Sequence, residues 1–222
     1  MNEYFEYTAE MIHSEDQAEE RIMYMARVSN PEQQDSGDVR LLSYLIRHGH
    51  WSPFDLVSFT FEFNTTRDIG RQCLRHQTLK PQEFSQRYAA KEVPEKYLRE
   101  ARLQHPTNRQ LSTPCEDQEI IRKWEDIQKN VMDFTYAQYD KALAAGIAKE
   151  QARALLPEGL TQSTMYFHGT LRSWLFFCKS RTPQEGAQKE ICDLASSVRS
   201  QLEEVTPNVC KAFFNIYCDK TQ

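Results

Sequence analysis

Residues 72–88 hold the densest group of side chains that could do chemistry. The segment reads Gln-Cys-Leu-Arg-His-Gln-Thr-Leu-Lys-Pro-Gln-Glu-Phe-Ser-Gln-Arg-Tyr, with two arginines, a histidine, a serine, a carboxylate and several amides. A guanidinium keeps its charge at any working pH and can give two parallel hydrogen bonds to a phosphate. A hydrophobic core would not use such residues, so the segment predicts a binding site for an anion.

A short helix is expected to lead into this segment. Arg67, Arg71 and Arg75 follow one another at intervals of four and would share one helix face between Thr66 and Arg75. A solvated, charged face is the alternative reading of such a stripe. The sequence Lys80-Pro81 does not allow a simple helical continuation, so we expect a loop that carries the polar groups away from the helix end.

Several familiar sites are missing from the sequence. No glycine-rich phosphate loop of the Rossmann or P-loop type occurs, and Ser85 lacks a nucleophile elbow. His48 and His50 form a His-x-His pair without further ligands at metal-binding spacing, so no metal site is predicted. Phosphates would then be held by side chains, and the candidates are Arg75, Arg87, Arg153, Arg172 and Arg181.

The remaining pattern predicts a mixture of helices and strands. Val57, Phe59, Phe61 and Phe63 alternate with polar residues, which is typical of a half-buried antiparallel strand over Leu56–Asn64. A second strand is expected over Leu160–Phe167. Helices are expected from a capping box at Ser14 to Arg27, from Asp38 to His48, from Pro114 to Ala145, from Ala148 to before Pro157, from the cap Thr170 through Trp174, and from a capping box at Thr182 to Glu204.

Composition narrows the class of protein. The 222 residues contain no linker-like stretch, so residues 1–222 are expected to form one domain. A net charge of −5 argues against a general nucleic-acid-binding surface. The six cysteines form no Cys-x-x-Cys pair, and neither a signal peptide nor a membrane-spanning run is evident, which indicates a reduced, cytoplasmic protein with no membrane partner.

Four blocks of sequence resemble the flavin-dependent thymidylate synthases. Arg75-His76-Gln77, seven residues and then Ser85 are similar to the family's Arg-His-Arg-x7-Ser signature. The segments that resemble the other blocks are His50-Trp51-Ser52-Pro53-Phe54, Ala152-Arg153-Ala154-Leu155-Leu156-Pro157, and Arg172-Ser173-Trp174 with the later Arg181. The chain departs from the family at Gln77, where a second arginine is usual, and at Phe176, where Asn or His is usual.

This resemblance implies a fold and a reaction. The fold would be α+β, with an antiparallel sheet flanked by helices, as in the thymidylate synthase-complementing proteins. The reaction would be reductive methylation of dUMP to dTMP, with 5,10-methylenetetrahydrofolate as carbon donor and NADPH as reductant by way of FAD. The family's assembly is a homotetramer whose active sites collect residues from several subunits.

The resemblance also assigns roles to individual residues. Arg181 would be catalytic, stabilising the N3-deprotonated uracil. The residues that would bind dUMP are Gln72, Arg75, Glu83, Ser85, Gln86, Arg87, Arg153 and Arg181. Those that would bind FAD are Ser52, Arg75, His76, Gln77, Glu83, Arg172 and Phe176, with His50 near the flavin and folate.

Two alternatives remain open. A relative that has lost activity, suggested by Gln77 and Phe176, would bind dUMP without turnover. A single-stranded nucleic-acid-binding module would use the arginine stripe together with Tyr88 and Trp174 as stacking platforms. Affinity for polymers that falls steeply with salt would distinguish the latter from a synthase, which would prefer the mononucleotide.

Overall fold

A four-stranded antiparallel sheet forms the centre of the molecule, in the order β1-β2-β6-β3. The computed structural model describes residues 4–85 and 98–218, so Gln86, Arg87 and Tyr88 lie outside the described residues. The strands are β1 (Thr8–His13), β2 (Ser58–Thr66), β3 (Lys80–Glu83) and β6 (Gln162–Thr170), and a separate hairpin consists of β4 (Arg102–Gln104) and β5 (Ser112–Pro114). An antiparallel sheet with helices was the expected fold class, and it is confirmed.

The alternating residues of the central strands β2 and β6 give this sheet one buried face and one more polar face. The two strands pair along their whole length, from Ser58 opposite Thr170 to Thr66 opposite Gln162. Phe59, Phe61 and Phe63 on β2 are fully buried, as the alternating pattern predicted. Their polar neighbours point to the other side of the sheet.

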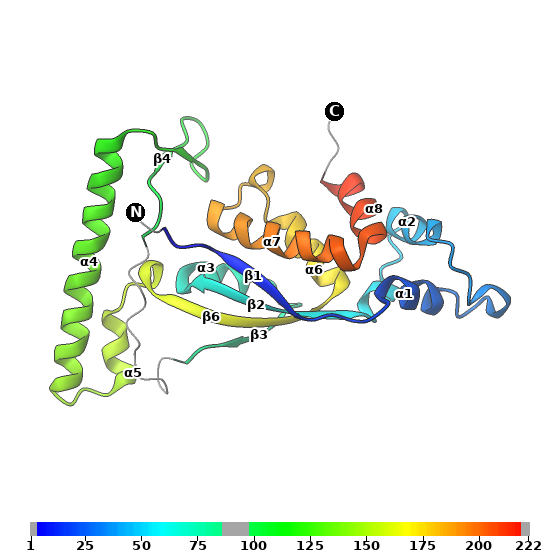
Figure 1. Ribbon diagram of the computed structural model, residues 1–222, viewed down its shortest axis with the longest axis horizontal. Helices are drawn as coiled ribbons and strands as arrows, with labels where there is room; N and C mark the ends of the chain where they lie inside the picture. Colours follow the sequence, from blue (N-terminus) through cyan, green and yellow to red (C-terminus); the bar gives the residue numbers. More distant parts are fainter. Residues whose placement is uncertain (1–3, 86–97, 219–222) are drawn as a thin grey trace.

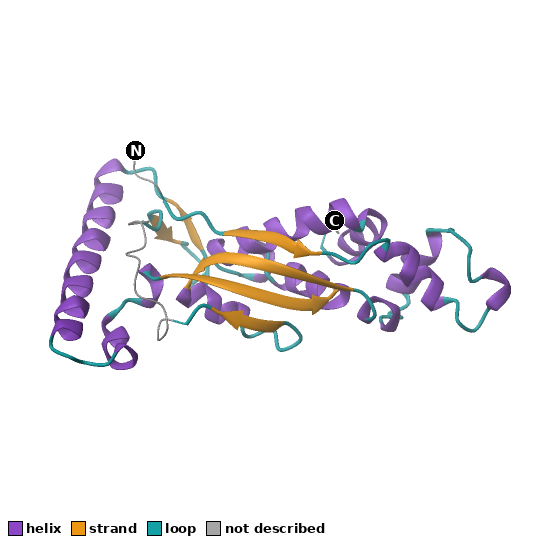
Figure 2. Cartoon of the chain, turned by 60° about the horizontal axis from the view of Figure 1, so that its bottom comes forward, coloured by secondary structure: helices purple, strands orange, loops and turns teal. Residues whose placement is uncertain are grey.

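The described residues form eight α-helices, several of which cover the buried face of the sheet. They are α1 (Ala18–Ala26), α2 (Arg40–Arg47), α3 (Arg67–Cys73), α4 (Gln118–Ala144), α5 (Lys149–Ala152), α6 (Leu171–Ser180), α7 (Lys189–Val205) and α8 (Pro207–Tyr217). Figure 1 shows α3, α6 and α7 on one side of the sheet, and Figure 2, viewed after a turn, shows the strands in front of them. The 27-residue α4 stands apart at one end of the molecule (Figure 1).

Trp174 on α6 anchors the core. Its side chain is fully buried, lies 4.7 Å from Phe61 between ring centroids, and donates from Nε1 to the carbonyl oxygen of Phe59 at 3.1 Å. Thr170 caps the same helix, because its hydroxyl accepts from the backbone N–H of Ser173 at 3.3 Å, as the sequence predicted. Helix α6 is therefore fixed rigidly to β2, and its two ends are held at defined places.

Three expected helix starts were wrong. The first helix begins at Ala18 after Gln17 in the left-handed conformation (φ 53°), with no side-chain cap from Ser14. Asp117 caps α4, while Pro114 ends β5. After Thr182 comes only a turn of 3-10 helix closed by Gly186 (φ 74°), so α7 begins later, at Lys189.

The expected loop after α3 was also wrong in part. Lys80–Glu83 form the edge strand β3, in which Pro81 is tolerated because only one side of the strand pairs. Strand β1 and helix α8 were not predicted.

Candidate functional site

Arg181 lies where α6 ends, and its own chain holds one edge of its guanidinium. Nε donates to Nε2 of His76 at 3.0 Å, and Nη2 donates to the backbone carbonyl of Gln72 at 3.0 Å. The third nitrogen, Nη1, makes no hydrogen bond with the described residues. Burial and the nearby positive charge of Arg75 lower the pKa of Arg181, although an arginine stays charged at neutral pH. A fixed cation with free donors is the arrangement expected for binding an anion.

His76 is held in place beside it. Its ring lies edge-to-face on the buried Phe177 of α6, with 4.9 Å between centroids. Burial, followed by the charges of Arg181 and Arg75, lowers the pKa of His76 to about 4. The imidazole is therefore neutral at pH 7. Because Nε2 accepts from Arg181, the proton is assigned to Nδ1.

The predicted arginine stripe is mostly neutralised. Arg67 pairs with Glu83 at 3.0 Å, and Arg71 pairs with Glu158. Helix α3 ends at Cys73, so Arg75 lies beyond the helix and is exposed. The stripe does not present three free cations to a nucleic acid.

Glu83 and Gln72, both predicted to bind substrate, also have partners within the chain. Besides Arg67, the Glu83 carboxylate accepts from the Ser163 hydroxyl at 3.0 Å. The side-chain Nε2 of Gln72 donates to Oε1 of Gln188 at 2.9 Å, which links α3 to the start of α7. The backbone of Gln72 thus contacts Arg181 while its side chain contacts α7.

A second group of predicted residues lies at the other end of α6. Arg172 donates from Nη1 to Oδ2 of Asp55 at 3.0 Å, and its guanidinium lies 6.0 Å from the centroid of the Trp51 ring. Ser52 is exposed in the 3-10 helix η2 (Ser52–Asp55) beside it. Phe176, half-buried, stacks edge-to-face on Trp51 (5.1 Å), so its aromatic contacts are made with the chain's own core.

His50 belongs to an exposed group of aromatic rings at the end of α2, with Tyr44 in the helix and His48 and His50 after it. Tyr44 lies 4.1 Å from His48 and 6.2 Å from His50, measured between ring centroids. No group of three His, Cys, Asp or Glu side chains able to hold a metal occurs in residues 4–85 and 98–218. The His-x-His pair is part of an aromatic surface.

Arg153 stands apart from both groups. It lies exposed in the 3-10 helix η3 (Arg153–Leu155), and its Nε donates to the carbonyl of Glu150 at 3.3 Å. Ser85 is half-buried and is the last described residue before the gap. Arg87 and Gln86 fall outside the described residues. The described candidate residues therefore lie around the two ends of α6, at the end of the edge strand β3 for Glu83 and Ser85, and near α4 for Arg153.

These side chains suit a flavin nucleotide. The exposed guanidinium groups of Arg75 and Arg172 and the amide of Gln77 can donate to a pyrophosphate. Arg75 and Gln77 make no side-chain hydrogen bond with the described residues. The exposed rings of Tyr44, His48 and His50 offer flat surfaces to a planar heterocycle. The donor set therefore fits the cofactor that the sequence resemblance implies.

Comparison with known proteins decides the family. Residues 10–208 match the family model described as thymidylate synthase complementing protein. The chain is 41% identical over 198 residues to a probable flavin-dependent thymidylate synthase of Paramecium bursaria Chlorella virus 1, covering 88% of this chain and 90% of that protein. It belongs to the flavin-dependent thymidylate synthases.

Other relatives agree with this assignment. A flavin-dependent thymidylate synthase of Synechocystis sp. is 40% identical over 191 residues, covering 86% of this chain and 87% of that protein. A crystal structure of a UMP/dUMP methylase, PolB from Streptomyces cacaoi bound with 5-Br dUMP, superimposes with a TM-score of 0.82 at 25% identity and covers 97% of both chains. The resemblance of the four sequence blocks to this family is thus confirmed.

Sequence reasoning missed the residues that fix the start of α3. Arg99 donates to both oxygens of Asp68, at 2.9 and 3.0 Å, and to the carbonyl of Gly159 at 3.0 Å. Burial disfavours both charges, but the hydrogen bonds between them outweigh it, so the pKa of Asp68 is lowered and that of Arg99 raised. Nothing in the sequence indicated that Arg99 pairs with a residue 31 positions earlier.

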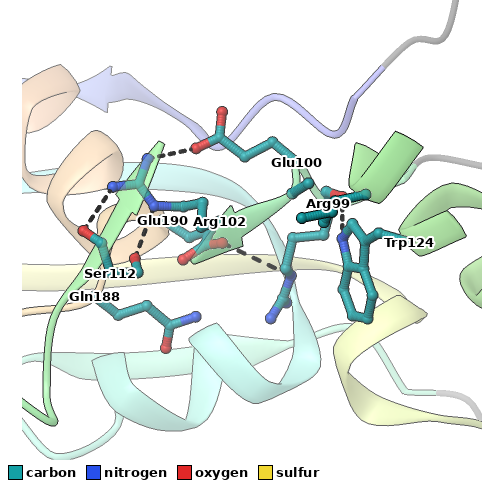
Figure 3. A pocket seen from close by; sticks show the side chains of 9 residues that line it. Arg99, Glu100, Arg102, Ser112, Trp124, Gln188 and Glu190 are labelled. Atoms are coloured by element: carbon teal, nitrogen blue, oxygen red, sulfur yellow. Dashed lines mark hydrogen bonds and ion pairs between the residues drawn. The ribbon is translucent and has the colours of Figure 1, made fainter. Parts of the chain in front are cut away.

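A hollow of about 310 Å³ lies beside this pair. Figure 3 shows Arg99 and Glu190 at its base, Arg102 linked to Glu100 and Ser112, and Trp124 closing one side, where its Nε1 donates to the Arg99 carbonyl at 2.8 Å. The charged groups around the hollow are paired with one another, so we regard it as structural.

No described helix is long and apolar enough to cross a membrane.

Proposed function

We infer that this chain is a flavin-dependent thymidylate synthase, which converts dUMP to dTMP by reductive methylation. We propose 5,10-methylenetetrahydrofolate as the carbon donor, NADPH as the reductant and FAD as the cofactor. The observation that carries the inference is the guanidinium of Arg181, fixed by His76 and Gln72 with free donors remaining.

Arg181 is the proposed catalytic residue. Uracil C5 is a weak nucleophile until electron density is pushed onto it, and a cation at the N3–O4 edge stabilises the N3-deprotonated anion that supplies this density. Two N–H groups of Arg181 donate to residues in the described part of the chain, and the other three are proposed for the pyrimidine. Because both anchors are preformed, the guanidinium does not have to reorient when charge develops.

Other residues bind the nucleotide. We propose Arg87 and Arg153 for the phosphate, with Gln72, Arg75, Glu83, Ser85 and Gln86 completing the dUMP site. The Arg67 and Ser163 contacts fix the Glu83 carboxylate as an acceptor that can face a sugar hydroxyl or a base N–H. Hydrogen bonds to a charged phosphate are worth about 1.5 to 3 kcal/mol each.

The flavin site is proposed at Ser52, Arg75, His76, Gln77, Glu83, Arg172 and Phe176, with His50 near the flavin and folate. FAD supplies the hydride when bound, and the protein's part is to orient it and exclude competing reactions. Asp55 holds Arg172 over Trp51, so this guanidinium is preoriented for an anionic group of the cofactor.

We further propose a homotetramer, and an apolar stripe on α4 supports association between copies of the chain. The stripe consists of five exposed side chains, namely Ile120, Trp124, Ile127, Val131 and Phe134. They are spaced alternately four and three residues apart, the spacing by which one helix packs against another. Phe134 is 65% exposed and Ile127 54%. A second copy of this chain is the proposed occupant, because the same stripe on two copies is self-complementary.

The scattered site residues support shared active sites. Arg153 lies near one end of α4, and the described contacts join it neither to Arg181 nor to Arg172. A neighbouring subunit packed along α4 would bring its own Arg153 to a site formed by the first subunit. Mixing two impaired variants, Arg153→Ala and Arg181→Ala, at a dUMP concentration too low to saturate Arg153→Ala would then regenerate some sites with both arginines intact. Recovered dTMP formation in mixed oligomers supports sharing, whereas no recovery after verified subunit exchange contradicts it.

One domain and a cytosolic location complete the proposal. A continuous cluster of buried residues runs from Phe5 to Phe214, which supports a single domain over residues 1–222. The cytosol is proposed from the cysteine pattern of the sequence.

The function is tested with purified protein, dUMP, NADPH, FAD and the folate donor. We expect dTMP to form only when all are present, and Arg181→Ala to lower turnover by about 100-fold or more, because losing one such donor costs about 3 kcal/mol. The variant should retain flavin. Binding of dUMP without any dTMP would instead indicate an inactive relative, and salt-sensitive binding of polymers in preference to dUMP would indicate a nucleic-acid-binding protein.

A further inference from the structure

The two contacts that hold Arg181 occupy one particular edge of its guanidinium. The Nε–H and one N–H of Nη2 form the side-on edge, and these are the donors that His76 and Gln72 accept. The end-on edge, between Nη1 and Nη2, makes no hydrogen bond with the described residues. That edge carries two parallel N–H groups, which match two adjacent acceptors such as the deprotonated N3 and O4 of uracil.

We propose that His76 is a positioning residue whose neutral ring, through Nε2, turns the end-on edge of Arg181 toward the pyrimidine. This inference rests on the proposed role of Arg181 and deepens it. A backbone carbonyl alone, that of Gln72, would leave the guanidinium free to rotate about one hydrogen bond. The second acceptor fixes its plane.

The surroundings keep His76 able to accept. A protonated imidazole has two donors and no acceptor, so it would break the contact and add a second positive charge. The charged groups facing the pair are Arg75, after α3, and Arg181 itself, and both disfavour protonation of the ring. Burial keeps the thiols of Cys73 on α3 and Cys192 on α7 neutral by raising their pKa to about 12 and about 11. No described anion near the ring draws a proton onto it.

Phe177 fixes the ring plane. Its edge-to-face contact with His76 comes from the same helix that ends at Arg181, so the ring and the guanidinium are placed by one rigid element. The protonated Nδ1 of His76 makes no hydrogen bond with the described residues, and this atom remains for the contact with FAD assigned to His76. The two roles use different ring nitrogens.

A pair of amide variants separates this role from simple packing. In His76→Gln the side-chain oxygen reaches the place of Nε2 and can accept from Arg181, whereas in His76→Asn the shorter amide reaches only the place of Nδ1. We expect His76→Asn to lower kcat by about 10- to 100-fold, in the range found for residues that orient a ligating or catalytic group, with little change in KM for dUMP. His76→Gln keeps the acceptor for Arg181 but loses the Nδ1 donor to FAD, so its flavin affinity should fall, while its kcat at saturating FAD should fall clearly less than that of His76→Asn. Equal kcat values in the two variants would overturn the proposal.

A binding measurement without turnover provides a second readout. Holoenzyme lacking folate is titrated with 5-fluoro-dUMP, whose N3 is more acidic than that of dUMP, and the N3 ionisation of the bound ligand is followed by ¹⁹F NMR as a function of pH. Wild type and His76→Gln should lower the N3 pKa of the bound ligand, and His76→Asn should lower it less. In an Arg181→Ala background the His76→Asn change should have no further effect. A full effect of His76→Asn in that background would overturn the proposal.

The failure of this inference is distinguishable from failure of the proposed function. Normal turnover of Arg181→Ala would remove the catalytic assignment of Arg181, on which this proposal rests. An inactive Arg181→Ala together with a fully active His76→Asn would remove only the role of His76.

If both His76 variants fail to fold, ¹⁵N NMR of histidine-labelled wild-type holoenzyme tests the protonation state of His76 that the proposal requires. An unprotonated Nε2 that persists to about pH 5 supports the proposal, and a protonated Nε2 at pH 7 overturns it.

Discussion

Arg172 Nη1 lies 3.0 Å from Oδ2 of Asp55, and this ion pair ties the first turn of α6 to the 3-10 helix that carries Ser52. Thr170 also donates to Asp55, through its hydroxyl at 3.1 Å. Both members of the pair are partly exposed, so its direct contribution to stability is small, about 0 to 1 kcal/mol. Its importance is in the direction it gives to the Arg172 guanidinium.

Replacing Asp55 by Asn should weaken FAD binding by about two- to fivefold, because Arg172 loses its charged partner and its fixed orientation. Titration of apo protein with FAD measures the effect. The melting temperature serves as control and should stay close to that of wild type. Tighter FAD binding in the variant would mean that Asp55 competes with the cofactor for Arg172.

Removing Arg153 should weaken the binding of dUMP, because the phosphate of the nucleotide loses a charged partner. The expected loss for Arg153→Ala is about 1.5 to 3 kcal/mol in dUMP affinity, while deoxyuridine, which has no phosphate, should bind poorly and almost equally to variant and wild type. Arg122 on α4 is another exposed arginine, so Arg122→Ala is the matched control and should change neither affinity. Equal losses for nucleoside and nucleotide would assign Arg153 to the base or sugar.

The departure at Gln77 predicts incomplete flavin occupancy. Gln77 is exposed, so Gln77→Arg has room to add the charge that is usual in the family, and FAD affinity should rise by on the order of 1 kcal/mol, about fivefold. Thr78→Arg, which adds the same charge at the exposed neighbouring position, should have a smaller effect. The ratio of flavin to protein after purification, together with FAD titration, measures both. If Gln77→Arg binds FAD no better than wild type, the pocket has rearranged around the amide.

An aspartate in the α4 stripe should break the assembly. Ile127→Asp buries a charge in the proposed interface and should shift the protein toward smaller species in analytical ultracentrifugation. Ala137→Asp adds the same charge at another exposed position of α4, outside the stripe, and should leave the assembly intact. An Ile127→Asp variant that sediments like wild type would show that the stripe is not an interface.

The buried neutral state of His76 predicts a pH dependence of stability. Its pKa is about 4 in the folded protein and about 6.5 for an ordinary histidine, so between these values the unfolded chain binds a proton that the folded chain does not. Stability is therefore lost as the pH falls from about 6.5 toward about 4. Solvent screening of a half-buried ring limits the loss to about 1 to 2 kcal/mol. Urea unfolding at several pH values should give a steeper loss for wild type than for His76→Gln, and parallel curves would contradict the assigned pKa.

Local pattern predicted the elements that follow local rules. The alternation in β2 and the Thr170 cap of α6 depend on neighbouring residues, and both were correctly predicted. Pro81 was interpreted as the mark of a loop, but at the edge of a sheet its missing N–H costs nothing, and whether a strand is at an edge depends on the whole topology.

The motif blocks named candidate site residues, but they did not indicate how these residues are arranged. The motif blocks pointed to His76 and Arg181, yet their hydrogen bond joins positions 105 residues apart. The pairing of Arg71 with Glu158 spans 87 residues and neutralises a charge that the sequence presented as free. Such contacts depend on the packing of α3 against distant elements, and no spacing rule within a segment encodes them.

The length of helix α6 fixes how Arg172 and Arg181, at its two ends, are rotated relative to each other about the helix axis. Arg172 lies in the first turn of α6 and Arg181 is its C-cap, nine residues later, a separation of about two and a half turns that places the two positions on roughly opposite sides of the helix axis. One inserted residue would rotate one relative to the other by about 100°, while Trp174 would still hold the helix to the sheet. Helix α6 therefore has a fixed length wherever both arginines serve the same reaction.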